Sequence, residues 1–181
     1  TAHSRKYQMY AHLYSACVYD ERGEYENAMS DYKTAFTLAE NMQDSLYMWR
    51  INNYMATINC NQAFIAEALR IYKKSVCLAN NYVEKARSYA NLAKMYYLND
   101  DKEQSIYYIE RSIEVAEVTD DENTKSQIYQ NAYVIYEENN ENELAWKYLN
   151  MSVNINRNGL PNYLYNLNFL SFFLDKNNMD S

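Results

Sequence analysis

Residues 16–35 read ACVYDERGEYENAMSDYKTA, and the spacing inside this stretch decides the fold. Small and aromatic residues recur in it at helical intervals: Ala16, Tyr19, Gly23, Tyr25, Ala28, Tyr32 and Ala35. The same seven columns return three times, as Ala56, Asn59, Ala63, Ile65, Ala68, Tyr72, Ser75; Ala93, Tyr96, Asp100, Lys102, Ser105, Ile109, Ser112; and Tyr133, Tyr136, Asn140, Asn142, Ala145, Leu149, Ser152. Because a period of roughly 20–50 residues is typical of stacked structural units, the chain is predicted to be a repeat protein.

The fifth and seventh columns hold Ala or Ser in every copy. Such small side chains are needed where the backbones of two antiparallel helices approach closely, while rings on the flanking turns fill the space on either side. Each copy is therefore predicted to be a helical hairpin.

Composition supports an all-α fold. The 181 residues include only 2 Gly and 1 Pro, although 48% are hydrophobic and 21 are Tyr. Tight β-hairpins and glycine-rich nucleotide loops need residues that tolerate positive φ, so a strand-rich or dinucleotide-binding fold of this length would contain more glycines.

The pattern resembles the tetratricopeptide repeat (TPR). This resemblance implies a right-handed α-solenoid of antiparallel helix pairs. We expect one TPR-like domain over residues 1–181, with repeats at about 9–42, 49–82, 86–119 and 126–159. The copies depart from the family at its tryptophan-like column, which reads His12, Asn52, Tyr89 and Tyr129. The second copy also has Asn59 where an aromatic residue is usual.

A ninth helix is predicted at about 161–174, after the four pairs. Its rings Phe169, Phe172 and Phe173 cover more of the helix than one contact face needs, so we expect an internal element that continues into further sequence. The alternative is a terminal cap that self-associates through the same rings.

Capping signals indicate where several helices begin and end. Asp44 and Ser45 can cap the helix through Trp49, and Thr119 with Glu122 has the spacing of a capping box. Gly23 stands where the first helix should end in a left-handed residue.

Catalytic groups are scarce. The chain has two histidines, His3 and His12, and three scattered cysteines, Cys17, Cys60 and Cys77, which fit neither a zinc motif nor a disulfide framework. His12 and Cys17 are poorly spaced for a dyad on one helix. We expect no enzyme activity, no cofactor and no metal.

The net charge of -7 argues against nucleic acid as a partner, because no large cationic surface is available for phosphates. No apolar stretch approaches the roughly 20 residues of a spanning helix, so membrane insertion is not expected. The sequence leaves open whether the segment resides in the cytoplasm or the periplasm.

The TPR resemblance also implies a binding surface, because the first helix of each TPR lines the concave face. The candidate residues carried over to this face are Tyr10, Leu13, Arg50, Asn53, Thr57, Asn61, Arg87, Lys94, Tyr97, Gln127 and Gln130. A groove so composed is basic in its middle, which predicts an extended protein or peptide partner with a central carboxylate. The carboxylate clamp of chaperone-tail TPR domains is not reproduced, since Leu13 and Cys17 replace its Lys and Asn.

The resulting interpretation is a non-catalytic protein- or peptide-binding module, the sensing or scaffolding segment of a larger bacterial signalling protein. Two alternatives remain. One is a glycan-binding surface protein with embedded TPR-like helices, which would use Tyr10, Tyr97, Tyr107 or Tyr108. The other is a structural module that self-associates through its C-terminal helix.

Overall fold

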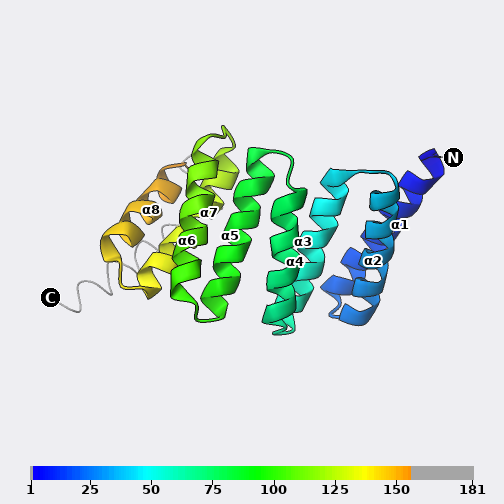
Figure 1. The fold of residues 1–181 in the computed structure, drawn as a ribbon, viewed down its shortest axis with the longest axis horizontal. Coiled ribbons are helices and arrows are strands. Elements are labelled where there is room, and N and C mark those ends of the chain that lie inside the picture. Colours follow the sequence, from blue (N-terminus) through cyan, green and yellow to red (C-terminus); the bar gives the residue numbers. More distant parts are fainter. Residues whose placement is uncertain (1, 156–181) are drawn as a thin grey trace. The chain divides into compact units, whose positions relative to one another are not determined.

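The computed structural model describes residues 2–155, which form eight α-helices without strands (Figure 1). In chain order they are α1 (Ala2–Glu21), α2 (Tyr25–Asn41), α3 (Ser45–Asn61), α4 (Ile65–Leu78), α5 (Tyr82–Leu98), α6 (Lys102–Glu117), α7 (Glu122–Glu138) and α8 (Asn142–Ile155). The prediction of an all-α chain built from consecutive helix pairs is confirmed. The helix predicted at 161–174 lies outside the described residues.

The chain divides into two compact units, and the boundary falls inside α5, between Ser88 and Tyr89. In the first unit α1 packs on α2 and α3 on α4, and α2 also contacts α3. In the second unit α7 packs on α8, and α6 contacts α7. Among residues 2–155, no helix combines the length and the apolar character that crossing a bilayer requires.

The small residues of the repeat lie at the centre of the helix packing. All eight side chains in the fifth and seventh columns are 0% exposed: Ala28, Ala35, Ala68, Ser75, Ser105, Ser112, Ala145 and Ser152. Their burial fits the sequence argument, because only side chains of this size let neighbouring backbones approach so closely.

The turn inside each hairpin contains one residue in the left-handed region. Gly23 has φ 73°, and the equivalent positions are Ala63 at 60°, Asp100 at 56° and Asn140 at 61°. The turn predicted at Gly23 is confirmed. Ala63 has the highest conformational energy of the four, because its Cβ is strained in the left-handed region, whereas Asp and Asn tolerate this conformation better.

Aspartate side chains cap several helices. Asp44 accepts a hydrogen bond from the Tyr47 amide, which confirms the predicted cap of α3. The capping box predicted at Thr119 and Glu122 is wrong. Asp121 caps α7 instead, by accepting from the Thr124 amide at 3.1 Å, and the Thr119 hydroxyl donates to the carbonyl of Ala116.

The left-handed alanine gives a stability prediction. We expect Ala63→Gly to raise the free energy of unfolding by about 0.5 to 1 kcal/mol, because relief of the αL strain exceeds the entropy that glycine adds to the unfolded chain. Urea unfolding followed by circular dichroism measures this change.

Two matched substitutions control for the general effect of glycine. Ala11→Gly, at an exposed site within α1, should destabilise by about 0.5 to 1 kcal/mol. Gly23→Ala should also lower the free energy of unfolding. Its only cause is the backbone strain of alanine at positive φ, since no atom lies within 4 Å of the added Cβ. A loss of stability in Ala63→Gly would show that the turn is not strained.

Candidate functional site

The predicted binding face begins with a row of rings and cations across α1 and α3. The rings of Tyr10 and Tyr47 lie 5.3 Å apart. The Lys6 ammonium lies 5.8 Å from the Tyr10 ring, and the Arg50 guanidinium 5.6 Å from the Tyr47 ring. We call these four side chains the α1–α3 ladder. It joins two predicted site residues, Tyr10 and Arg50, through Tyr47, which the sequence interpretation missed.

The two phenols of the ladder also interact through their hydroxyl groups. A hydrogen bond with Tyr10 is the main cause that raises the pKa of Tyr47, and partial burial acts in the same direction. Both rings are half-buried, whereas Lys6 and Arg50 are exposed. The ladder therefore presents neutral, fixed rings with a cation at each end.

Asn53 and Thr57 continue the same face of α3 beyond Arg50. The Asn53 amide donates to the Trp49 carbonyl at 2.7 Å, and the Thr57 hydroxyl lies 3.1 Å from the hydroxyl of Tyr72 on α4. Burial raises the pKa of Tyr72. These bonds fix the orientation of both polar side chains relative to the helix pair.

Arg50 and Arg87 occupy the same repeat position on successive first helices. A buried hydrogen bond of 2.9 Å, from the Trp49 indole to the Ser88 hydroxyl, ties α3 to the beginning of α5 beside them. Arg87 is half-buried, and Asn61 is exposed at the end of α3. Leu13 is only 8% exposed, so its side chain contributes to packing.

The remaining predicted residues belong to the second unit. Lys94 and Gln127 are exposed, while Tyr97 and Gln130 are half-buried. Burial raises the pKa of Tyr97, and the carboxylates of Glu138 and Glu137 act in the same direction. Tyr97 and Glu138 also line a small cavity of about 140 Å³. The surroundings of Tyr97 are thus acidic, in contrast to the cationic ends of the ladder.

The structure separates the two residues considered for a dyad. His12 shares a hydrogen bond of 2.8 Å with Asp31, and the Tyr32 hydroxyl donates to the Cys17 sulfur at 3.4 Å. Within the described part of the chain, no three or more His, Cys, Asp or Glu side chains are grouped as metal ligands would be.

The comparisons show what the fold resembles. No family model matches the sequence, and no curated protein does. Among solved structures, a putative kinesin light chain from Podosopora anserina with nearly identical TPR-like repeats aligns with a TM-score of 0.71 and 14% identity, over 94% of this chain and 87% of the other. BtubC from P. vanneervenii aligns with a TM-score of 0.69 and 18% identity, over 79% of this chain and 60% of its own length.

The apo form of RapI aligns with a TM-score of 0.68 and 16% identity, over 94% of this chain and 49% of RapI. The chain therefore spans about half of RapI and three fifths of BtubC. At these identities the alignments show the fold alone, and they confirm the predicted resemblance: the described helices form TPR-like pairs.

Proposed function

We propose that this chain is a non-catalytic protein-binding module that takes an extended peptide on the first helices of its repeats, beginning with the face that α1 and α3 form within the first unit. Within a longer protein it would serve as the sensing or scaffolding segment of a bacterial signalling system. The observation that supports the proposal best is the α1–α3 ladder, in which Lys6, Tyr10, Tyr47 and Arg50 lie in one row across two helices.

The ladder suits a peptide for two physical reasons. Tyr10 and Tyr47 hold each other in place, so they offer apolar contact at a low cost in side-chain entropy. Arg50 can form a paired hydrogen bond with a carboxylate while it stays next to the Tyr47 ring. Asn53 and Thr57 follow at helical intervals and supply polar groups along the same line.

Calorimetry with an acidic peptide tests the proposal. We expect the double variant Arg50→Ala plus Arg87→Ala to lower the affinity by tenfold or more, since each charge-assisted contact contributes about 1.5–3 kcal/mol. The matched control is Arg22→Ala plus Lys85→Ala, which removes the same charge from exposed positions outside the predicted face. Equal affinities of the two double variants would contradict the proposed face.

A further inference from the structure

One side-chain contact recurs at the same two repeat positions in all four helix pairs. The contacting residues are 19 positions apart, as in the hydrogen bonds from His12 and from Asn52. The pairs are His12 with Asp31, Asn52 with the carbonyl of Ile71, Tyr89 with Tyr108, and Tyr129 with Tyr148. The repeats therefore share a wedge-shaped space between their two helices, which holds a His–Asp pair in the first copy, an asparagine in the second and tyrosines in the third and fourth.

In the third and fourth repeats three tyrosines fill this wedge. Tyr96 stacks on Tyr108 at 5.3 Å with an angle of 4° between the rings, and Tyr136 stacks on Tyr148 at 5.6 Å with 12°. Tyr89 and Tyr129 complete the two sets as the third ring. Three of the four repeats have tyrosine at this column, as Tyr19, Tyr96 and Tyr136.

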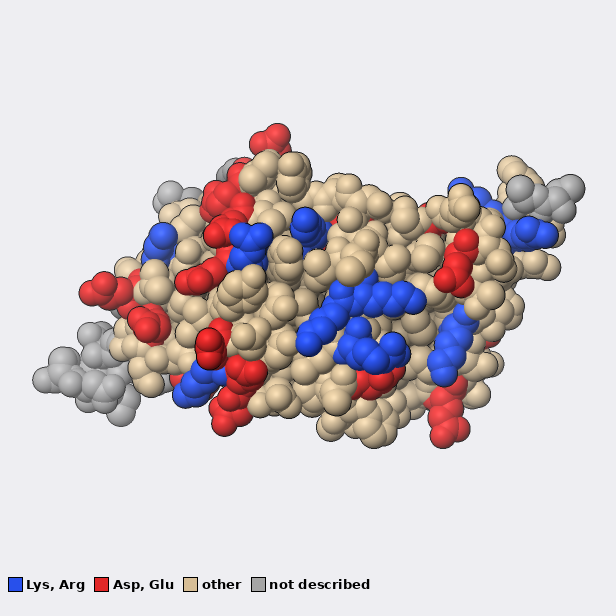
Figure 2. All heavy atoms as spheres, in the orientation of Figure 1, with Lys and Arg blue, Asp and Glu red and all other residues tan. Residues whose placement is uncertain are grey.

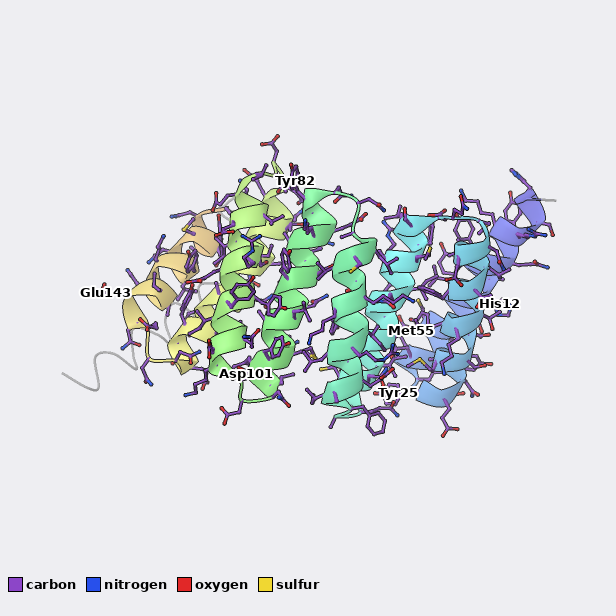
Figure 3. All side chains as sticks on the ribbon, in the orientation of Figure 1. His12, Tyr25, Met55, Tyr82, Asp101 and Glu143 are labelled. Carbon is purple, nitrogen blue, oxygen red and sulfur yellow. The ribbon has the colours of Figure 1, made fainter. Side chains whose placement is uncertain are left out.

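The second repeat lacks all three rings. Asn52, Asn59 and Ile71 stand at the tyrosine positions, and all three line a groove of about 290 Å³. The groove is lined by α2 on one side, α4 on the other and α3 at its base. Figure 3 shows Met55, one of the lining residues, between α2 and α4. Replacement of three rings by smaller side chains accounts for the opening.

Two asparagines at the base of the groove have incomplete hydrogen bonding. Asn52 is 3% exposed and Asn59 8%. Their amide nitrogens donate to the carbonyls of Ile71 and Met55, both at 2.8 Å. The Asn52 nitrogen also donates to the Ser75 hydroxyl at 2.7 Å, so the hydrogen bonds that both asparagines make within the described residues use the amide nitrogen and not the oxygen. Since a buried acceptor without a partner is costly, these oxygens favour a ligand that brings N–H groups.

The walls and rim combine apolar and cationic groups. Met29 and Phe36 of α2 line the groove, and the Lys74 ammonium lies 4.7 Å from the Phe36 ring. Lys33 and Arg70 complete the cationic rim, which belongs to the cluster of Lys and Arg visible over α2 and α4 in Figure 2.

One carboxylate, that of Glu67, also belongs to the rim. Arg70 holds Glu67 through two hydrogen bonds of 2.8 and 2.6 Å, which lower the pKa of the carboxyl, and Lys33 acts in the same direction. Glu67 offsets one of three cations, so the rim keeps a positive charge in a chain whose net charge is -7.

We propose that this groove is a second binding site, for an acidic peptide segment that carries an aromatic side chain. The aromatic ring occupies the space that tyrosines fill in the other repeats, carboxylates on either side of it pair with Lys33 and Lys74, and peptide N–H groups donate to the asparagine oxygens. The site is distinct from the ladder face, because Asn52 and Asn59 lie on the side of α3 opposite Arg50, Asn53 and Thr57.

The test uses the peptide Asp-Asp-Phe-Asp-Asp-amide with a fluorescent label on its N-terminus, and measures its anisotropy with the whole chain carrying Arg50→Ala plus Arg87→Ala, so that the arginines of the other proposed face cannot hold the acidic peptide. We expect Asn59→Tyr, which restores the usual tyrosine, to fill the groove and abolish binding while the circular dichroism spectrum stays unchanged. Leu46→Tyr is the control, since it places the same ring at an exposed site on the same helix, away from the groove, and it should bind as the chain without this change does. Full binding by Asn59→Tyr would overturn the proposal.

Charge variants test the rim independently. Lys33→Glu plus Lys74→Glu should lower the affinity for the peptide at least tenfold. Glu67→Gln should raise this affinity severalfold, because it releases Arg70 from its ion pair. Binding should persist in the chain that carries Arg50→Ala plus Arg87→Ala, which separates this site from the ladder face. Two control ligands test the assignment to an aromatic acidic peptide. If a peptide with Ala in place of Phe, or an oligothymidylate, bound as tightly as the Phe-containing peptide, the assignment would be overturned.

Discussion

Tyr148→Ala is expected to lower the free energy of unfolding by about 3 to 5 kcal/mol, the range for truncating a large buried ring. Tyr148 is 8% exposed and belongs to α8. It stacks on Tyr136 at 5.6 Å and meets Tyr129 at 5.7 Å, both on α7. The substitution therefore removes two ring contacts and leaves a cavity in the wedge between α7 and α8. The shift of the urea midpoint, followed by circular dichroism, gives the change.

Two further tyrosine variants identify the cause. Tyr148→Phe keeps the ring and should cost less than about 1.5 kcal/mol. Tyr14→Ala makes the same truncation at a position that is 70% exposed, where an effect within about 0.5 kcal/mol is expected. If both alanine variants lost the same stability, the packing of the wedge would not explain the result.

The sequence predicted the helix pairs because their determinants are local and repeated. Ala28 and Ser75 identify a close helix contact by size and spacing alone, and both prove to be fully buried. Asp44 was identifiable as a cap for a similar reason, since the signal lies within one turn of the helix that it begins. Hence the fold followed from the spacing of a few columns.

Some local features gave misleading or no sequence signals. Alanine is a helix former, so the residue type gave no signal for the left-handed φ of 60° at Ala63, and only its place in the column of Gly23 indicated the turn. Thr119 had the spacing of a cap, but Asp121 lies closer to the first turn of α7 and accepts the hydrogen bond there. His12 stands in an aromatic column, yet its ring bonds to Asp31 on α2.

The candidate sites depend on contacts between helices, which spacing within one repeat does not encode. Tyr47 precedes the repeat that begins at Trp49, so the column pattern passed over the ring that joins Tyr10 to Arg50. The groove was missed because the family pattern directs attention to the opposite face of α3. A signal for it was present nevertheless: Asn52 and Asn59 both replace residues of the aromatic columns.

The second large effect concerns the distance between paired helices. Ala56 of α3 is 0% exposed and stands in the first small column of the repeat. Ala56→Leu should lower the free energy of unfolding by about 1 to 3 kcal/mol, because the added carbons can be placed only by shifting side chains or moving the helices apart. Urea unfolding measures the loss, and near-UV circular dichroism reports any change in the packing of the tyrosines.

The matched variant is Ala66→Leu, which adds the same atoms to an exposed position of α4, the partner helix. It should change stability by no more than about 0.5 kcal/mol, since leucine is nearly as good a helix former as alanine and meets only solvent there. A difference between the two variants isolates the cost of close packing from that of helix propensity. If Ala56→Leu were as stable as Ala66→Leu, the small columns would not set the helix separation, and the physical basis for the repeat would be wrong.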